Sequence, residues 1–403
     1  MPVSFRPMLS AALSAALMIS PVAYSAEQSA IWFEHTDINL PANTTVSNLD
    51  NGLRYIVLPT SRTSDEISIR VRIGAGVDNG SAEYMLSQLI ATNITASSQW
   101  QASMGSSQTV LSLDLAHADD AQLEQQLAHI KAALVQAPYS DDDSLQAEFA
   151  KLSAQPLNEA ITEFHQRYYQ PKNISVIVTG GVKGRDVTRL IRQQFGHWDA
   201  SHSSSIHLAN NTISTTDNNT QDMTDALALV TFKPLQSEID SKQQRKDMLM
   251  AMLANRLIEQ RIAHALEQQQ SIATVQVKNH RLFQQQLMSQ IRVSGLSPDE
   301  RAKAQKLVRE EIRRAAASGF TQAEYEMIVS QVRQELQRQT RLENQTYSSD
   351  QADRLVAAIN QGIVYTDPSY DLELLNFHVA HLNEFDISKT FESMWSEDNI
   401  REL

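Results

Sequence analysis

The sequence predicts an α+β protein with two repeated domains, each an antiparallel-rich sheet packed by helices. Apolar residues alternate in some stretches, as in strands, and recur at helical spacing in others. These stretches lack the regular alternation of a doubly wound parallel sheet. A Ser-, Asn- and Thr-rich stretch over 201–224 interrupts the pattern, which restarts beyond it. We therefore predict a first domain over 26–200, a linker over 201–224 and a second domain over 225–403.

Residues 1–25 have the layout of a cleaved secretory signal. Arg6 precedes an apolar run from Met8 to Ile19, and small residues follow at Ala23 and Ser25. This run is too short to span a bilayer comfortably, and no later stretch reaches the roughly 18 apolar residues that a membrane helix needs. We expect export across the inner membrane to the periplasm, with no integral membrane segment in the mature chain. An uncleaved N-terminal anchor is the alternative.

The composition narrows the possible functions. The chain has no cysteine, so it can form neither disulfides nor a thiolate nucleophile. Its length and its 42% hydrophobic content suffice for ordinary hydrophobic cores. The net charge of −13 argues against nucleic acid as a partner, because phosphate binding requires a basic patch.

The elements of the first domain follow from local patterns. The Asn51-Gly52 pair supplies the backbone angles of a tight turn and predicts a hairpin leading into 53–58. Isoleucines and a valine alternate with polar residues over 67–73, which predicts a half-buried strand. The same periodicities predict further strands at 108–118 and 173–182, and helices at 82–91, 119–136, 158–170 and 184–198.

The second domain repeats this mixture of elements. Ser297 is a good helix cap and Gly319 a good helix stop, so a helix is expected between them. Periodicity predicts strands at 226–234, 271–280 and 286–296, helices at 241–269 and 321–342, and further helices after residue 350.

Three stretches carry a resemblance to a known family. LDNGLRYIVLPTSR, followed by IRVRIGAGVDNG, resembles the opening hairpin and second strand of the pitrilysin/insulinase family of zinc metallopeptidases. AITEFHQRYYQPKNISVIVTGGVKGRDVTRLIRQQFGHW resembles that family's helix, strand and glycine-pair block, and MLANRLIEQRIAHAL less specifically resembles a helix of its following domain. The resemblance implies the half-shell of two α+β domains found in these peptidases.

The family's zinc motif is degenerate in this chain. Active members carry His-x-x-Glu-His on the helix after the second strand, where two histidines bind zinc and the glutamate activates a water. The corresponding window is EYMLSQL, with Tyr84 and Gln88 at the histidine positions and Ser87 at the glutamate position. A phenol and an amide are poor zinc ligands, and a serine hydroxyl cannot act as the base unaided. We predict neither a catalytic residue nor a bound metal.

Other parts of the family's machinery also lack counterparts. No histidine occurs between His35 and His117, and the third ligand of active relatives, a glutamate, falls in a shortened stretch where Glu124 and Glu148 remain. Thr274 stands near the position of a catalytic tyrosine in the later domain. All of these differences point to loss of the family's catalytic site.

Several histidines need a separate interpretation. His378 and His381 are three residues apart, but two ligands do not make a zinc site, so we expect an adventitious or surface pair. We expect a packing role for His165. A divergent metal site would have to use His117, His129 or the His378 pair.

The resemblance leads to a functional hypothesis. We expect an exported, non-catalytic insulinase-like protein, without a cofactor, that serves as a partner or scaffold subunit for an active zinc peptidase or binds extended peptides along an exposed sheet edge. The alternatives are a divergent zinc metallopeptidase acting on peptides and a structural envelope protein.

Overall fold

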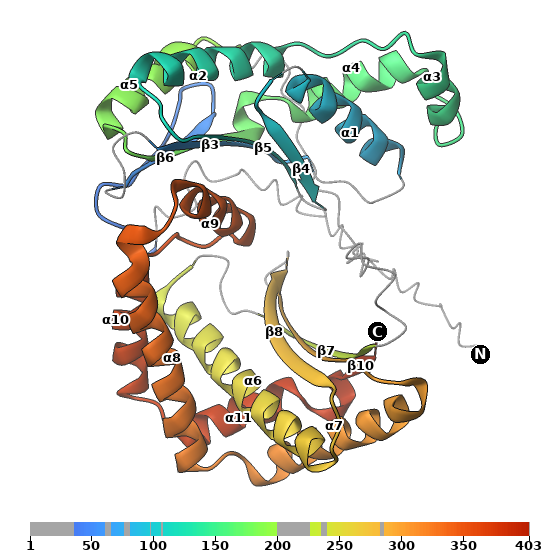
Figure 1. Cartoon of the computed structure of the whole chain (residues 1–403), viewed down its shortest axis with the longest axis vertical. Coiled ribbons are helices and arrows are strands. Elements are labelled where there is room, and N and C mark those ends of the chain that lie inside the picture. Colours follow the sequence, from blue (N-terminus) through green and yellow to red (C-terminus); the bar gives the residue numbers. More distant parts are fainter. Residues whose placement is uncertain are drawn as a thin grey trace, which may run out of the picture.

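Two layers, each made of one sheet and its helices, form the body of the molecule (Figure 1). The computed structural model describes residues 36–60, 66–75, 81–96, 98–105, 108–199, 226–234, 240–282 and 286–402. The predicted signal over 1–25 and the predicted linker over 201–224 lie outside these residues. The predicted α+β class, with antiparallel-rich sheets packed by helices, is confirmed.

The first layer contains a six-stranded sheet in the order β1-β2-β6-β3-β5-β4. Only the pairing of β2 with β6 is parallel among these strands. The predicted hairpin at Asn51 is confirmed, because β1 and β2 pair in antiparallel fashion around it. The strands are β1 (Thr45–Asn48), β2 (Arg54–Pro59), β3 (Ile67–Ile73), β4 (Gln101–Gly105), β5 (Gln108–Leu115) and β6 (Ile174–Gly180).

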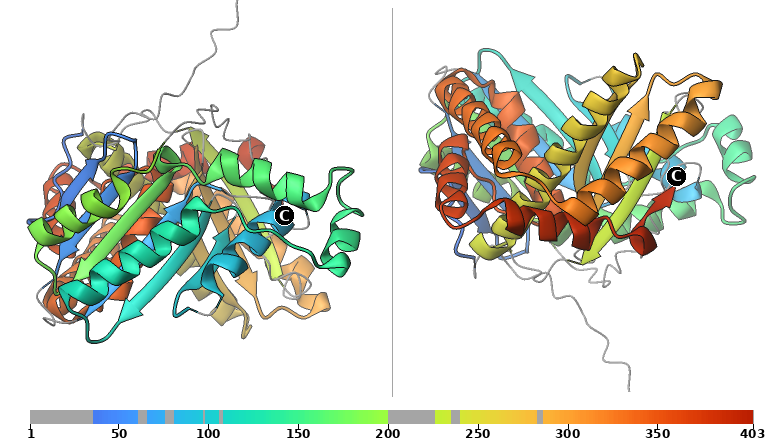
Figure 2. Two further views of the ribbon diagram at one scale, coloured as in Figure 1. Left: turned by 90° about the horizontal axis from the view of Figure 1, so that it is seen from above. Right: turned by 90° about the horizontal axis from the view of Figure 1, so that it is seen from below.

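Helices cover the outer face of this sheet, as Figure 2 shows in its left panel. They bury Ile69 and Val71 of β3, together with the apolar residues of the same row on its neighbours, in one large core. Burial of this apolar surface is the main source of the layer's stability. The helices of the first half are α1 (Ala82–Thr95), α2 (Asp120–Val135), α3 (Asp143–Phe149), α4 (Leu157–Tyr168) and α5 (Gly184–Phe195).

The second layer contains a four-stranded antiparallel sheet in the order β10-β7-β9-β8. The predicted helix limits at Ser297 and Gly319 are confirmed, since Ser297 forms a capping box with Glu300 and Gly319 ends the helix at a φ of 69°. The elements are β7 (Ala226–Pro234), β8 (Thr274–Leu282), β9 (Gln286–Ser294), β10 (Arg401–Glu402), α6 (Lys242–Gln268), α7 (Pro298–Ser318), α8 (Gln322–Leu342), α10 (Pro368–Val379) and α11 (Glu384–Met394).

One helix from the C-terminal half lies on the first sheet. Helix α9 (Ser348–Gln361) covers the inner face of that sheet, where Leu355 and Val356 pack with Ile56 and Ile177. Figure 1 shows α9 between the two sheets. The strand predicted over 67–73 is confirmed, but the prediction that it is half-buried is wrong, because α9 also covers the face that carries the polar residues of β3.

The polar residues of β3 bind α9 directly. Arg70 is only 2% exposed. Its Nε donates to Asp353 of α9 at 2.6 Å, and its Nη1 donates to Asp114 of β5 at 2.8 Å. Ser68 and Ser348 place their hydroxyl oxygens 2.9 Å apart. A buried guanidinium requires such partners, because an uncompensated charge is costly away from water.

We expect Asp353→Asn to destabilise the chain. The substitution removes one of the two charged partners of Arg70 and should lower the free energy of unfolding by about 1–2 kcal/mol, since both carboxylates keep some contact with water. Asp350→Asn on the exposed side of the same helix is the control and should cost less. Urea unfolding measures both values, and equal costs would contradict a role for Asp353 in holding α9.

A second ion pair should make stability depend on acid. Arg261 holds Glu324 through a bidentate contact at 2.7 and 2.8 Å and lowers the pKa of this carboxyl to about 2, against an ordinary value of 4.5. The stabilisation is complete above about pH 4.5 and is lost as the pH falls towards 2. Glu324→Gln should therefore cost about 1 kcal/mol at pH 7 and less at pH 3. Exposed Glu373→Gln, the control, should show no such trend.

Candidate functional site

Helix α1 carries the three positions that match the zinc motif. The helix begins after Ser81, whose hydroxyl accepts the backbone N–H of Tyr84 at 3.0 Å. Tyr84 is partly buried against the core of the first layer, and Gln88 is exposed. The two residues that replace the histidines are therefore in different environments, with a phenol ring packed on the core and an amide in solvent.

Ser87, at the position of the glutamate, is fully buried. Its Oγ lies 3.0 Å from Oγ1 of Thr109 on β5, and the Thr109 hydroxyl donates to the carbonyl of Ala75 at 3.3 Å. Since the Thr109 proton is already used, Ser87 must donate in this pair. The hydroxyl of Ser87 thus connects α1 to the sheet. Its proton is engaged with Thr109, and a neutral hydroxyl is not a base that could take a proton from a water.

The acidic residues considered as a third ligand lie on other helices. Glu124 on α2 accepts a hydrogen bond from Gln193 at 3.3 Å, and Glu148 is exposed on α3. Within the described ranges, no group of three or more His, Asp or Glu side chains could hold a metal ion. The absence of a cofactor stays a prediction that metal analysis must test.

The histidines singled out from the sequence have separate surroundings. His165 is buried, its Nε2 lies 3.0 Å from the carbonyl oxygen of Leu134, and its ring stacks on Tyr169 at 4.9 Å. Burial lowers the pKa of His165, in keeping with a packing role. The expectation of a surface pair at 378 and 381 is wrong in part, because His378 is buried whereas His381 is exposed. His117 and His129 are exposed, and neither belongs to a possible metal-binding group of three or more side chains among the described residues.

Strand β4, which packs against α1, is an edge of the first sheet. In the part of the chain that the structure describes, β5 is the only strand paired with β4, so the other edge of β4 presents unpaired backbone groups. Its sequence, QASMG, contains none of the lysines or prolines with which proteins commonly protect an edge. Most of its side chains are exposed. As far as the described residues go, this edge is available to a further strand.

A shallow surface depression lies at the start of β8. It has a volume of about 310 Å³, and Thr274 and Glu259 contribute to its wall. The carboxylate of Glu259 already accepts the backbone N–H of Val277 at 2.7 Å. The other carboxylate in its wall, Glu267, is exposed and lies 3.9 Å from Nδ1 of His264.

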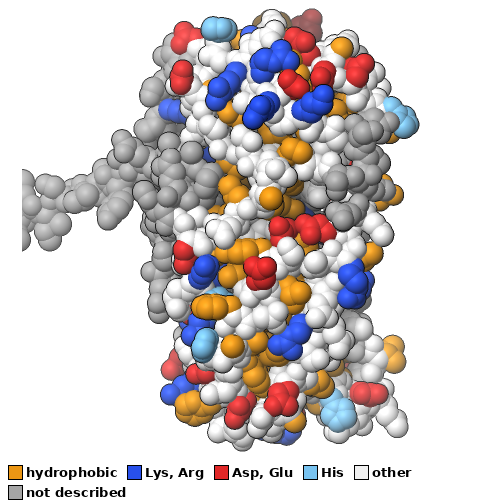
Figure 3. Space-filling view, turned by 90° about the vertical axis from the view of Figure 1, so that its left-hand side faces the viewer, with side chains coloured by type: hydrophobic (Ala, Val, Ile, Leu, Met, Phe, Trp, Pro, Cys, Tyr) orange, Lys and Arg blue, Asp and Glu red, His pale blue; other side chains and the backbone are white. Residues whose placement is uncertain are grey.

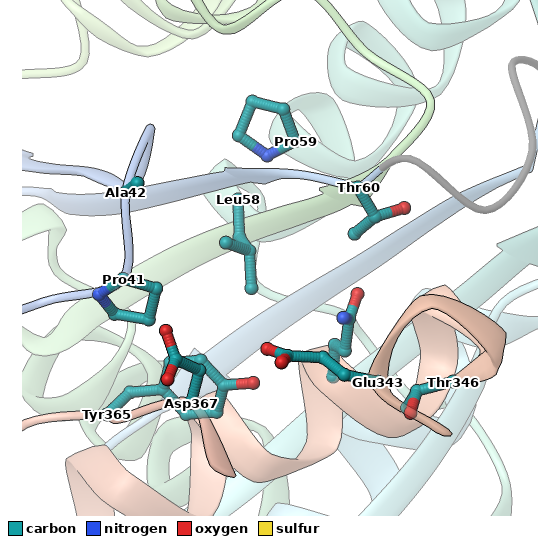
Figure 4. Close-up of a pocket in the computed structure, with 10 residues that line it drawn as sticks. Pro41, Ala42, Leu58, Pro59, Thr60, Glu343, Thr346, Tyr365 and Asp367 are labelled. Carbon is teal, nitrogen blue, oxygen red and sulfur yellow. The ribbon is translucent and has the colours of Figure 1, made fainter. Parts of the chain in front are cut away.

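A pocket of about 180 Å³ lies where the two layers meet, and the sequence analysis missed it. Leu58 and Pro59 at the end of β2 form part of its wall, and Glu343, Tyr365 and Asp367 come from the C-terminal half. Figure 4 shows these three polar side chains extending into the same space. No local sequence signal marks them, because each falls at a helix end or in a connection where acidic and aromatic residues are common.

Comparison with known proteins places this geometry in context. A family model described as the inactive domain of peptidase M16 matches residues 157–332, from α4 into α8. The first half of the periplasmic protease PqqL from Escherichia coli matches over 91% of this chain and 92% of its own, at 15% identity and a TM-score of 0.73. This chain is a pitrilysin/insulinase-like protein.

Other solved structures agree with this assignment. The insulinase-like chain matches a predicted insulinase family protease from Yersinia pestis over 89% of its length, with 16% identity and a TM-score of 0.69. A second structure of PqqL is not limited to the first half of that protein, and this chain covers 48% of it. The chain therefore spans about half the length of PqqL. At these identities the matches show the half-shell fold. A comparison with curated protein sequences finds no match.

The insulinase-like chain offers a direct test of the role of Ser87. Ser87→Ala should lower the free energy of unfolding by about 1 kcal/mol, because Thr109 loses its donor in a buried setting. Gln88→Ala, on the exposed side of the same helix, should change it by less than about 0.5 kcal/mol. Thermal and urea unfolding of the two variants measure this difference. A neutral Ser87→Ala variant would show that the hydroxyl contact contributes nothing.

Proposed function

We propose that this insulinase-like chain is a non-catalytic protein that binds extended peptides along the free edge of β4. The proposal rests on two features of the first layer that lie next to each other. The helix that bears zinc ligands in active relatives here uses Ser87 for a structural hydrogen bond, and the edge strand beside it is unprotected. On this proposal the strand edge that binds a peptide is kept, whereas the zinc ligands and base that would hydrolyse it are lost.

The chemistry of α1 supports the non-catalytic part. Zinc peptidases need a metal with an open coordination position and a base that takes a proton from the bound water. Tyr84 and Gln88 are poor ligands for zinc, and Ser87 is buried with its donor already engaged. The match to the family's inactive domain does not bear on this point, because it begins at residue 157, after α1.

The geometry of β4 supports the peptide-binding part. A peptide that adds a strand gains backbone hydrogen bonds whatever its sequence, and its alternate side chains face the two sides of the sheet. The uncharged side chains of β4 impose no strong selection on the sign of the peptide's charge. Binding would therefore be broad in sequence and would favour unfolded segments.

The proposal extends to partner and location. We infer that the chain acts beside an active insulinase-like peptidase subunit and presents peptides to it. The signal-like residues 1–25 and the likeness to a protease titled as periplasmic support a periplasmic site of action. No helix among the described residues is long and apolar enough to cross a membrane.

Metal and cleavage assays separate the proposal from the divergent-peptidase alternative. The mature chain, dialysed against excess zinc and then washed, should retain far less than one zinc per chain and should leave an unstructured test peptide intact. Zinc content is measured by mass spectrometry and cleavage by chromatography. Stoichiometric zinc together with hydrolysis would establish the enzyme alternative and refute the proposal.

Two proline substitutions test the edge of β4. Successive N–H groups of a strand point in opposite directions, so Ala102 and Ser103 direct one N–H towards β5 and one towards the free edge. Of Ala102→Pro and Ser103→Pro, one should destabilise the fold, whereas the other should keep it and abolish peptide binding. The probe is a fluorescent peptide of alternating Thr and Val.

An N-methylated copy of the probe serves as the matched control, because it cannot pair with a strand edge. Fluorescence anisotropy should show binding of the unmodified peptide alone. If both peptides bind equally, or if the well-folded proline variant still binds, the interaction does not use strand addition.

A further inference from the structure

We propose that the pocket between the two layers is a binding site for an alkyl ammonium group, as carried by a lysine side chain. This site is independent of the peptide edge. The pocket adjoins the end of β2, whereas β4 is the opposite edge of the same sheet. Figure 3, which views the left side of Figure 1, shows acidic side chains at the height where the layers meet.

The shape of the pocket suits a short chain with one polar end. Pro41, Leu58 and Pro59 form apolar parts of its wall, and carboxylates occupy another part. A volume of about 180 Å³ is well above the roughly 30 Å³ that one water occupies in the liquid. An aliphatic stem can therefore contact the prolines and Leu58 while its head reaches the carboxylates, as lysine side chains commonly do.

The lining of the pocket contains hydroxyls and an amide as well as two carboxylates, but some of its acceptors have no donor. Among the described residues, none donates a hydrogen bond to the carboxylate of Glu343. The Oε1 atom of Gln351 is buried and has no hydrogen-bond partner, although Gln351 lines the pocket and is only 9% exposed. Buried acceptors normally have a donor, so this set calls for one. An ammonium group supplies three N–H donors and no acceptor.

The charges of the pocket point to the same ligand. Asp367 already uses its Oδ1 to accept from Ser369 and from the backbone of Tyr370, which fixes the carboxylate at the start of α10. Burial raises the pKa of Glu343, and the negative charge of Asp367 raises it further, while Arg354 acts in the opposite direction. A cation between Glu343 and Asp367 would relieve this repulsion.

An organic cation fits better than a metal ion. Among the described residues, Glu343 and Asp367 are the only carboxylates that line the pocket, and no group of three or more His, Asp or Glu could hold a metal ion. Hard divalent cations usually require more oxygen ligands in a regular arrangement. The adjacent apolar wall would be of no use to such an ion, but it would hold an alkyl stem.

Calorimetry with three small probes tests the site on the full mature chain. Nα-acetyl-lysine methylamide should bind, and Nα-acetyl-norleucine methylamide, which has the same stem without the ammonium, should not. Binding should also raise the melting temperature, because a ligand of the native state stabilises it. Tighter binding of the lysine compound than of n-butylammonium assigns the site to a lysine residue, and the reverse order assigns it to a free amine.

Variants connect the binding to the named carboxylates. Glu343→Gln and Asp367→Asn should each weaken binding of the lysine compound by about tenfold or more, as expected for loss of a charged hydrogen-bond acceptor. Asparagine is itself a good helix cap, so Asp367→Asn should keep α10 intact. Exposed Glu392→Gln on α11 is the matched control and should bind like the wild type.

The outcomes decide the inference in either direction. Equal binding of the norleucine and lysine compounds, no binding of any amine, or unchanged affinity in a folded Glu343→Gln variant would overturn it. These readouts involve neither zinc nor strand pairing at β4, so they are distinguishable from failure of the proposed peptide-binding function.

Discussion

The buried guanidinium of Arg70 is the contact on which the arrangement of the two halves depends. It starts on β3, binds Asp114 on the neighbouring strand and reaches Asp353 on α9. A charge that is only 2% exposed must keep such partners, and this requirement sets the position of α9 over the sheet. Hydrogen bonds from Ser68 and Thr179 to Ser348 fix the start of the same helix.

This contact explains why the first sheet has two different faces. The outer face is largely apolar and packs on the helices of its own half, with Thr109 as a polar contact to α1. The inner face mixes Ile56 and Ile177 with the polar side chains of β3, and its apolar part packs on α9. The edge at β4 and the pocket at β2 are thus held on one rigid sheet, at opposite sides of it. Two ligands could bind there without competing for the same atoms.

Much of the fold can be predicted from local patterns, because those patterns reflect local physics. The Asn51-Gly52 turn, the cap at Ser297 and the stop at Gly319 each depend on a few neighbouring residues, and each appears as expected. The alternation over 67–73 correctly marks a strand. Its polar residues nevertheless suggest that one face of the strand is exposed to solvent, since nothing near them in sequence indicates that Asp353 and Ser348 will cover them.

The same limit applies to the candidate sites. The positions of Tyr84, Ser87 and Gln88 could be found by comparison with a spaced motif, but the bond from Ser87 to Thr109 could not, because it joins a helix to a separate strand. The junction pocket combines Leu58 with Glu343 and Asp367, whose proximity arises only once the two layers have assembled. Sites built from distant segments leave no periodicity to detect.

The place of α9 in the chain has a consequence for biogenesis. When the polypeptide emerges with its N-terminus first, β1 to β6 can pair early, yet their inner face has no cover until β7 to β9 and α5 to α8 have all been made. During that interval Ile56 and Ile177 face water, and Arg70 contacts Asp114 but still lacks its contact with Asp353. The nascent first half therefore presents apolar surface of the kind that holding chaperones bind, and this surface is covered only once α9 has been made.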